Sequence, residues 1–133
     1  MTPRQEAVRR VLARHSDAFD YGTSDCCQLA LEVARSVRAL RPGAPPLVAP
    51  EYACEGEAAA VIAHHGGMQA LVTTVLGHGP TDKPPRDGDV ALVHMVGVGE
   101  ALAVWCSGKP LVKATTRFIS LPPGAAKFTW SVD

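Results

Sequence analysis

The amino-acid sequence predicts a single α+β domain over residues 1–133, in which N-terminal helices pack on a C-terminal antiparallel sheet. Two features of the sequence support this prediction. Up to Leu76 the apolar residues recur at helical spacing, whereas from Val90 onward they form short extended runs that Gly and Pro divide. A hydrophobic content of 47% and a charged content of 20% are typical of a globular domain.

Charge and composition argue against several classes of partner. The 13 basic residues balance 13 acidic ones and aromatic residues make up only 5%, so neither an overall field nor a stacking surface favours nucleic acid. No apolar run is long enough to span a bilayer and no signal peptide follows Met1, so we expect no membrane span and synthesis in the cytoplasm. The 4 cysteines form no CxxC pair, so we expect reduced thiols and neither a metal nor a cofactor.

The first helix is expected to begin at Pro3. Thr2 has the side-chain oxygen of an N-cap, Pro3 suits the first helical position, and Gln5 can reach back to complete a capping box. One apolar stripe then follows at helical spacing, made of Ala7, Val8, Val11 and Leu12.

The central helix is expected over residues 24–40, and the rest of the chain is organised around it. Ser24 or Asp25 can cap its first turn, and Arg41-Pro42-Gly43 ends it. Its apolar residues follow helical spacing, and we expect four of them to be buried against the sheet: Ala30, Val33, Ala34 and Val37 against Leu92, Ala103 and Trp105.

Cys26 falls in the first turn of this helix. Free backbone amides and the helix dipole favour a thiolate at that position, which is a feature of reactive cysteines. The alternative is that Cys26 and Cys27 are small buried apolar residues, which is the commoner role of a free cysteine.

Two more helices are expected before the sheet, over residues 55–65 and 68–76, with Gly66-Gly67 between them. The Pro-rich segments 41–53 and 77–89 are expected to be irregular connections. Five strands are then expected at residues 90–96, 101–106, 111–115, 118–121 and 128–132. If Gly97 and Val98 form a two-residue turn, His94 lies directly opposite Ala101 on the neighbouring strand.

The ordered motifs Tyr21-Gly22-Thr23-Ser24-Asp25-Cys26-Cys27-Gln28-Leu29, Gly88-Asp89-Val90-Ala91-Leu92-Val93 and Ala101-Leu102-Ala103-Val104-Trp105 resemble the NlpC/P60 superfamily of papain-like cysteine hydrolases. The chain is most similar to a small phage and prophage protein family related to that superfamily and encoded among tail genes. The resemblance implies a papain-like NlpC/P60-type fold, with Cys26 at the position of the nucleophile. The base histidine of the superfamily corresponds to a position at or beside Ala101, where this chain has no histidine.

The resemblance implies a phage tail protein, synthesised in the host cytoplasm and placed in the virion tail, at the tail tip or in tail assembly. Because a cysteine hydrolase needs a base beside its thiol, we expect a structural protein without enzymatic activity. It would act by binding other phage tail proteins, through segments 41–53 and 77–89.

The alternative is an active cysteine peptidase or amidase that contacts peptidoglycan and cleaves its peptides during infection. This function would use Cys26 as the nucleophile and His94 as the base, with amides at the helix start as an oxyanion site. A thiol-redox protein is disfavoured, because the sequence has no CxxC motif.

Overall fold

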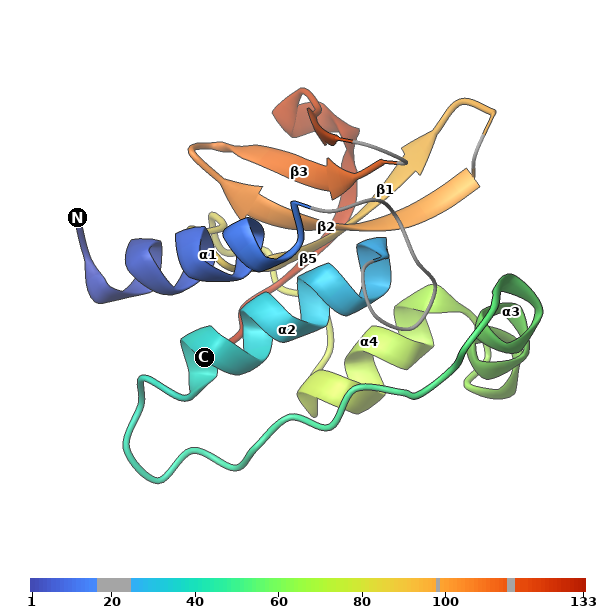
Figure 1. The fold of residues 1–133 in the computed structure, drawn as a ribbon, viewed down its shortest axis with the longest axis horizontal. Helices are drawn as coiled ribbons and strands as arrows, with labels where there is room; N and C mark the ends of the chain where they lie inside the picture. Colours follow the sequence, from blue (N-terminus) through green and yellow to red (C-terminus); the bar gives the residue numbers. More distant parts are fainter. Residues whose placement is uncertain (17–24, 98, 115–116) are drawn as a thin grey trace.

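The computed structural model describes residues 1–16, 25–97, 99–114 and 117–133, and it has an α+β fold (Figure 1). Its helices are α1 (Pro3–Arg14), α2 (Cys26–Arg38), α3 (Glu55–His64) and α4 (Met68–Leu76), with a short 3₁₀ helix η1 (Pro123–Ala125). Its strands are β1 (Val90–Met95), β2 (Gly99–Cys106), β3 (Lys109–Lys113), β4 (Phe118–Ser120) and β5 (Ala126–Trp130). They form one antiparallel sheet in the order β4-β3-β2-β1-β5. The predicted α+β class, with N-terminal helices and a C-terminal antiparallel sheet, is confirmed.

The ends of the first two helices follow local sequence signals. The Thr2 side chain accepts a hydrogen bond from the Gln5 amide at 3.1 Å, and the Gln5 side chain accepts one from the Thr2 amide at 3.0 Å. This confirms the predicted capping box. Asp25 is the N-cap of α2, and its carboxylate accepts from the Gln28 amide at 2.8 Å. Ser24, the other candidate cap, lies outside the described residues.

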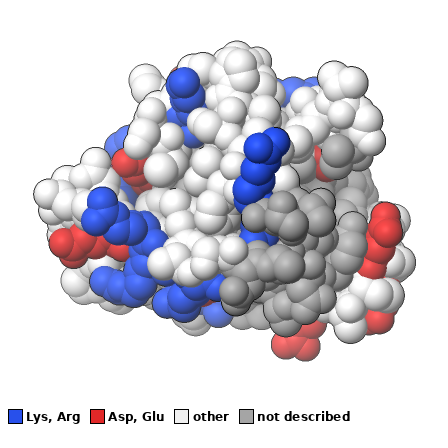
Figure 2. All heavy atoms as spheres, turned by 45° about the horizontal axis from the view of Figure 1, so that its top comes forward, with Lys and Arg blue, Asp and Glu red and all other residues white. Residues whose placement is uncertain are grey.

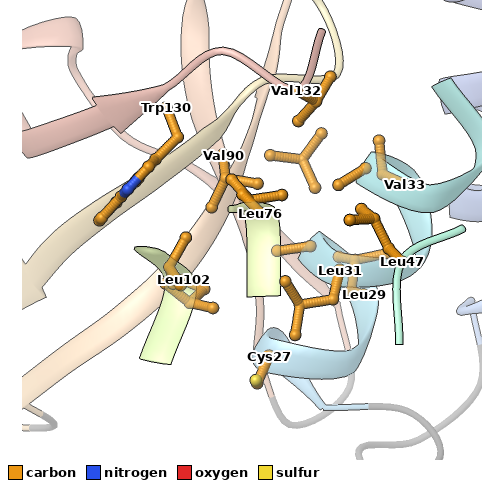
Figure 3. Packing of buried hydrophobic residues seen from close by; sticks show 14 of the residues in the cluster. Cys27, Leu29, Leu31, Val33, Leu47, Leu76, Val90, Leu102, Trp130 and Val132 are labelled. Carbon is orange, nitrogen blue, oxygen red and sulfur yellow. The ribbon is translucent and has the colours of Figure 1, made fainter. Parts of the chain in front are cut away.

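Helix α2 lies at the centre of the fold, packed against α1 on one side and against β2 on the other (Figure 1). Its apolar face is almost completely buried, and α4 contributes Leu71 and Val72 to the same core. Figure 3 shows Leu29 and Val33 of α2 among residues of this core that come from the sheet, such as Val90 and Leu102. The burial predicted for Ala30, Val33, Ala34 and Val37 is confirmed.

The predicted partners of α2 on the sheet are only partly right. Leu92 belongs to the core that contains α2, but Ala103 and Trp105 belong to a separate cluster with Ala91 and Val93. Successive residues of a strand point to opposite faces, so the β2 residues in the α2 core are Leu102 and Val104 instead. The prediction assigned the wrong face of β2 to the helix.

The predicted register of the β1–β2 hairpin is also wrong by one residue. His94 pairs with Glu100, and Ala101 pairs with Val93. Met95 pairs with Gly99, so three residues separate the strands instead of the two that were assumed. A shift of one residue changes which side chains share a face, and the geometric argument that brought His94 beside Ala101 therefore fails.

The Gly88-Asp89 pair makes a tight junction between the helices and β1. Gly88 has a φ of +93°, and a Cβ at this position would lie 2.7 Å from Cγ2 of Val37 in α2. The buried Asp89 carboxylate accepts from the Arg4 guanidinium at 2.7 Å, from the Arg86 amide at 2.8 Å and from the Val132 amide at 3.1 Å. The motif therefore ties α1 and the C-terminal segment to the start of the sheet.

In the part of the chain that the structure describes, no single helix has the length and hydropathy needed to cross a membrane. Helices α3 and α4 would meet this criterion only as a pair, which is bent by 74° at the break between them.

Candidate functional site

A pocket of about 570 Å³ opens at the N-terminus of α2. Its walls come from the start of α2, from α3 and the start of α4, and from strands β1 to β4. The described residues that line it are Asp25, Cys26, Cys27, Tyr52, Glu55, Ala58, Ala59, Ile62, Met68, Met95, Glu100, Ala101, Val112, Lys113, Ala114 and Ile119. Most of these side chains are apolar, and a pocket of this size is large enough to receive a ligand or a side chain of another protein.

Cys26 is half-buried at the first helical position of α2, and it packs against the cluster that contains Ala101 and Val112. Burial raises the pKa of its thiol, and the charge of Asp25 adds to this effect. The backbone amides of Leu102, Cys27 and Cys26 itself act in the opposite direction but do not outweigh burial. The amides at the helix start therefore favour the thiolate, as expected, but desolvation has the larger effect and the pKa of the thiol is raised.

Cys27 and Asp25, which are buried, and Tyr52, which is partly buried, form a polar group at the start of α2. The Tyr52 hydroxyl donates to Oδ1 of Asp25 at 2.8 Å, the same oxygen that caps α2. Burial, with smaller contributions from the charges of Asp25 and Cys26, raises the pKa of Cys27 to about 12. Burial and the nearby Cys27 and Asp25 also raise the pKa of the Tyr52 hydroxyl. All three proton-bearing groups, Cys26, Cys27 and Tyr52, thus stay neutral near pH 7.

The segment that carries Tyr52 is fixed to α2 by a second hydrogen bond. The Gln28 side chain donates to the carbonyl of Pro50 at 2.9 Å. Together with the Tyr52–Asp25 hydrogen bond, this contact turns the end of the Pro-rich connection into a wall of the pocket. Sequence reasoning did not identify Tyr52 as a site residue. The only signal was that it is the one aromatic residue in segment 41–53.

All five histidines lie in the described part of the chain, and none of them is among the residues that line the pocket. His94, the predicted base, is exposed on β1. His15 is buried and its Nε2 lies 2.6 Å from Oε2 of Glu32. His65 and His78 lie against backbone carbonyls, those of Val61 and Ser131 respectively.

The position that the resemblance assigns to the base does fall at the site. Ala101 lines the pocket with Cys26, and its methyl group belongs to the cluster on which Cys26 packs. Ala114, which follows β3, also lines the pocket. The structure thus places Cys26 and Ala101 in the lining of one pocket, whereas His94 lies on β1 and outside that lining.

Lys113 is a second residue that the sequence did not identify. It is buried, lines the pocket and donates to the carbonyl of His15, beyond the end of α1. Among the described residues no group of three or more His, Cys, Asp or Glu side chains is arranged to hold a metal ion. All 4 cysteines are free, and Cys54 and Cys106 are not among those that line the pocket.

Fold and site together define an α+β domain with an apolar pocket beside the N-terminus of its central helix. The chain belongs to the family described as Domain of unknown function (DUF6950), which matches residues 2–132. No curated protein and no solved structure matches the sequence.

Proposed function

We propose that this protein is a structural component of a phage tail, at the tail tip or in tail assembly, with a degenerate NlpC/P60-like site. It acts by binding other tail proteins and resides in the virion tail. The proposal combines the resemblance of the Asp25-Cys26 and Gly88-Asp89 motifs with one structural observation. Cys26 and Ala101 share a pocket, and no histidine is among its described lining residues.

The chemistry of the pocket supports a role without hydrolysis. A thiol attacks a peptide carbonyl as the thiolate, and burial raises the pKa of the Cys26 thiol. A base next to the thiol would compensate, but an alanine occupies the position that the resemblance assigns to that base. Loss of general-base assistance typically costs a factor of about 10²–10⁴ in rate. The pocket suits contact with an apolar group better than it suits bond cleavage.

A second candidate function is a cysteine peptidase or amidase that acts on peptidoglycan peptides. One observation favours it: the amides of Leu102 and Cys27 lie close enough to the Cys26 sulfur to lower its pKa. Amides placed in this way could stabilise an oxyanion beside the sulfur. His94, the base proposed for this function, is exposed and outside the pocket lining.

The two functions are separated by growing a phage that encodes this chain with Cys26→Ser. Loss of the whole gene should prevent tail formation, which establishes that the protein is needed. Under the binding role, Cys26→Ser particles should form normal tails in electron micrographs and infect at the wild-type level. Normal tails that adsorb but fail to penetrate the envelope would overturn the binding role.

The purified protein allows a direct test of hydrolysis. Incubation with peptidoglycan should release no peptide fragments above the level seen with Cys26→Ser. Release that requires Cys26 would overturn the structural role, and its loss in His94→Ala would identify the base. The exposed His64, remote in sequence from the hairpin, provides the matched control as His64→Ala.

A further inference from the structure

We propose that the pocket beside Cys26 receives a large apolar side chain from a basic segment of a partner protein. This inference rests on the binding function proposed above and names the surface and the chemistry of the partner. It differs from the expectation that segments 41–53 and 77–89 make the contact.

The lining is suited to an apolar group. Apolar side chains come from several elements: Ala58, Ala59 and Ile62 of α3, Met68 of α4, Met95 of β1, Ala101 of β2, Val112 of β3 and Ile119 of β4. The two methionines adapt their shape to whatever fills the space between them. Because burial raises the pKa of the Cys26 thiol, the sulfur at the start of α2 is neutral and does not oppose an apolar group.

The charged side chains that are exposed among the described lining residues are acidic. Glu55 of α3 and Glu100 of β2 come from different walls, and both are exposed. Among the described residues, the ion pair of Glu100 is a long, exposed contact with Lys127, at 3.9 Å, which stabilises little. Among the described residues of the lining, Lys113 is the one basic residue, and it is buried and donates to the carbonyl of His15.

Further exposed carboxylates lie on and just before α3, beside the pocket. Glu51 and Glu57 flank Glu55 in the sequence, and both are exposed. Figure 2 shows acidic side chains at the edge where α3 lies in Figure 1, whereas at the opposite edge acidic side chains lie together with most of the Lys and Arg side chains in view. The protein has no net charge overall, but these exposed glutamates give the end with the pocket a local negative potential.

An apolar pocket with carboxylates at its mouth favours a segment that has an apolar side chain next to basic residues. A Leu, Met or Phe side chain would fill the pocket, and Lys or Arg residues beside it would face Glu55 and Glu100. Such pairs at a rim contribute to the rate of association and to the choice of partner more than to affinity. An anionic lipid surface is disfavoured, because its head groups would meet these carboxylates.

The test is a selection of random 12-residue peptides displayed on a carrier, with the full-length protein immobilised as bait. Enriched peptides should carry Leu, Met or Phe next to Lys or Arg. Their affinity is then measured by fluorescence polarisation against two variants of α3. Ala59 is exposed and lines the pocket, whereas the neighbouring Ala60 is exposed and does not. Ala59→Trp should weaken binding at least tenfold, and Ala60→Trp should leave it unchanged.

The role of the charges is tested with the same peptides. Reversal of both carboxylates, Glu55→Lys with Glu100→Lys, should weaken binding at least tenfold at low salt and by less at high salt. Glu6→Lys on the exposed first turn of α1 is the matched control and should have no effect. Enrichment of acidic peptides, insensitivity to Ala59→Trp, or preferential binding of phosphatidylglycerol vesicles would overturn the inference.

These measurements use purified protein and no phage. If the pocket binds no basic apolar peptide but Cys26→Ser particles assemble and infect normally, the binding function stands and uses another surface. If Cys26 proves necessary for peptidoglycan cleavage, the structural role itself fails, whatever the peptides do.

Discussion

Arg4 and Asp89, which are 85 residues apart in the sequence, form a largely buried ion pair with 2.7 Å between Nη2 and Oδ1. The same guanidinium donates to the carboxylate of Asp133 at 2.9 Å. Helix α1, the residue before β1 and the C-terminal segment are thereby joined through one side chain. The Gly88-Asp89 motif is thus a structural anchor of the fold.

Asp89→Ala should destabilise the protein strongly. The carboxylate accepts from Arg4, from the Arg86 amide and from the Val132 amide. Its removal takes the acceptor from both amides and leaves the Arg4 guanidinium with Asp133 and the Asp87 carbonyl. Removal of one partner of a buried ion pair costs about 3–5 kcal/mol. Urea unfolding followed by circular dichroism measures the change, with the exposed Asp82→Ala as control. A loss below about 1 kcal/mol, the scale of an exposed pair, would contradict the anchoring role.

Gly88→Ala should destabilise the protein for two reasons. The residue has a φ of +93°, and its Cβ would lie 2.7 Å from Cγ2 of the buried Val37. Overpacking of this kind costs about 1–3 kcal/mol, to which the backbone strain adds. The double variant with Val37→Ala should lose less stability than the sum of the two single variants, because it removes the clash. Additive losses would show that the backbone conformation alone explains the effect.

Alkylation of Cys26 should be slow at neutral pH and should rise continuously as the pH increases. Burial raises the pKa of its thiol, so the thiolate fraction near pH 7 is small. Iodoacetamide labelling followed by mass spectrometry should give a rate at least about tenfold below that of the exposed Cys54 at pH 7. His94→Ala should not change the profile. A plateau at acidic pH that disappears in His94→Ala would instead indicate a thiolate–imidazolium pair.

Stability should depend on pH through Glu32. Burial opposes ionisation of its carboxyl, but the hydrogen bonds from His15 and Arg14 outweigh burial and hold its pKa below the ordinary value of 4.5. A carboxyl with a lowered pKa in the folded state stabilises the protein above its unfolded pKa, and this contribution is lost as the pH falls through the folded value. Urea unfolding between pH 7 and pH 3 should show this loss in the wild type.

Glu32→Gln should remove that part of the pH dependence. Because the Glu32 side chain is partly open to solvent, the expected difference is about 1 kcal/mol or less. Glu6→Gln, on the exposed first turn of α1, is the matched control and should leave the profile unchanged. A Glu32→Gln profile parallel to that of the wild type would show that the His15–Glu32 contact does not contribute.

Local features of the molecule could be predicted from sequence because their causes lie within a few residues. The Thr2–Gln5 capping box and the Asp25 cap each depend on a side chain close to the backbone amide from which it accepts. The break at Gly66-Gly67 depends on the positive φ angles that glycine adopts without strain. The burial of Val33 and Val37 follows in the same way from helical spacing. The approach of Ala101 to Cys26 was anticipated only through the resemblance to a known family.

Tertiary structure alone decided the face of β2 that meets α2, the pairing of His94 with Glu100, the contact of Tyr52 with Asp25 and the pKa of Cys26. In a strand, a shift of one residue exchanges the two faces, and periodicity cannot distinguish the two registers. The helix start favours a thiolate on Cys26, but burial depends on Ala101, Val112 and other distant residues that cover the sulfur. Local sequence therefore determined the elements and their caps, whereas long-range packing determined which residues form the pocket and how its thiol ionises.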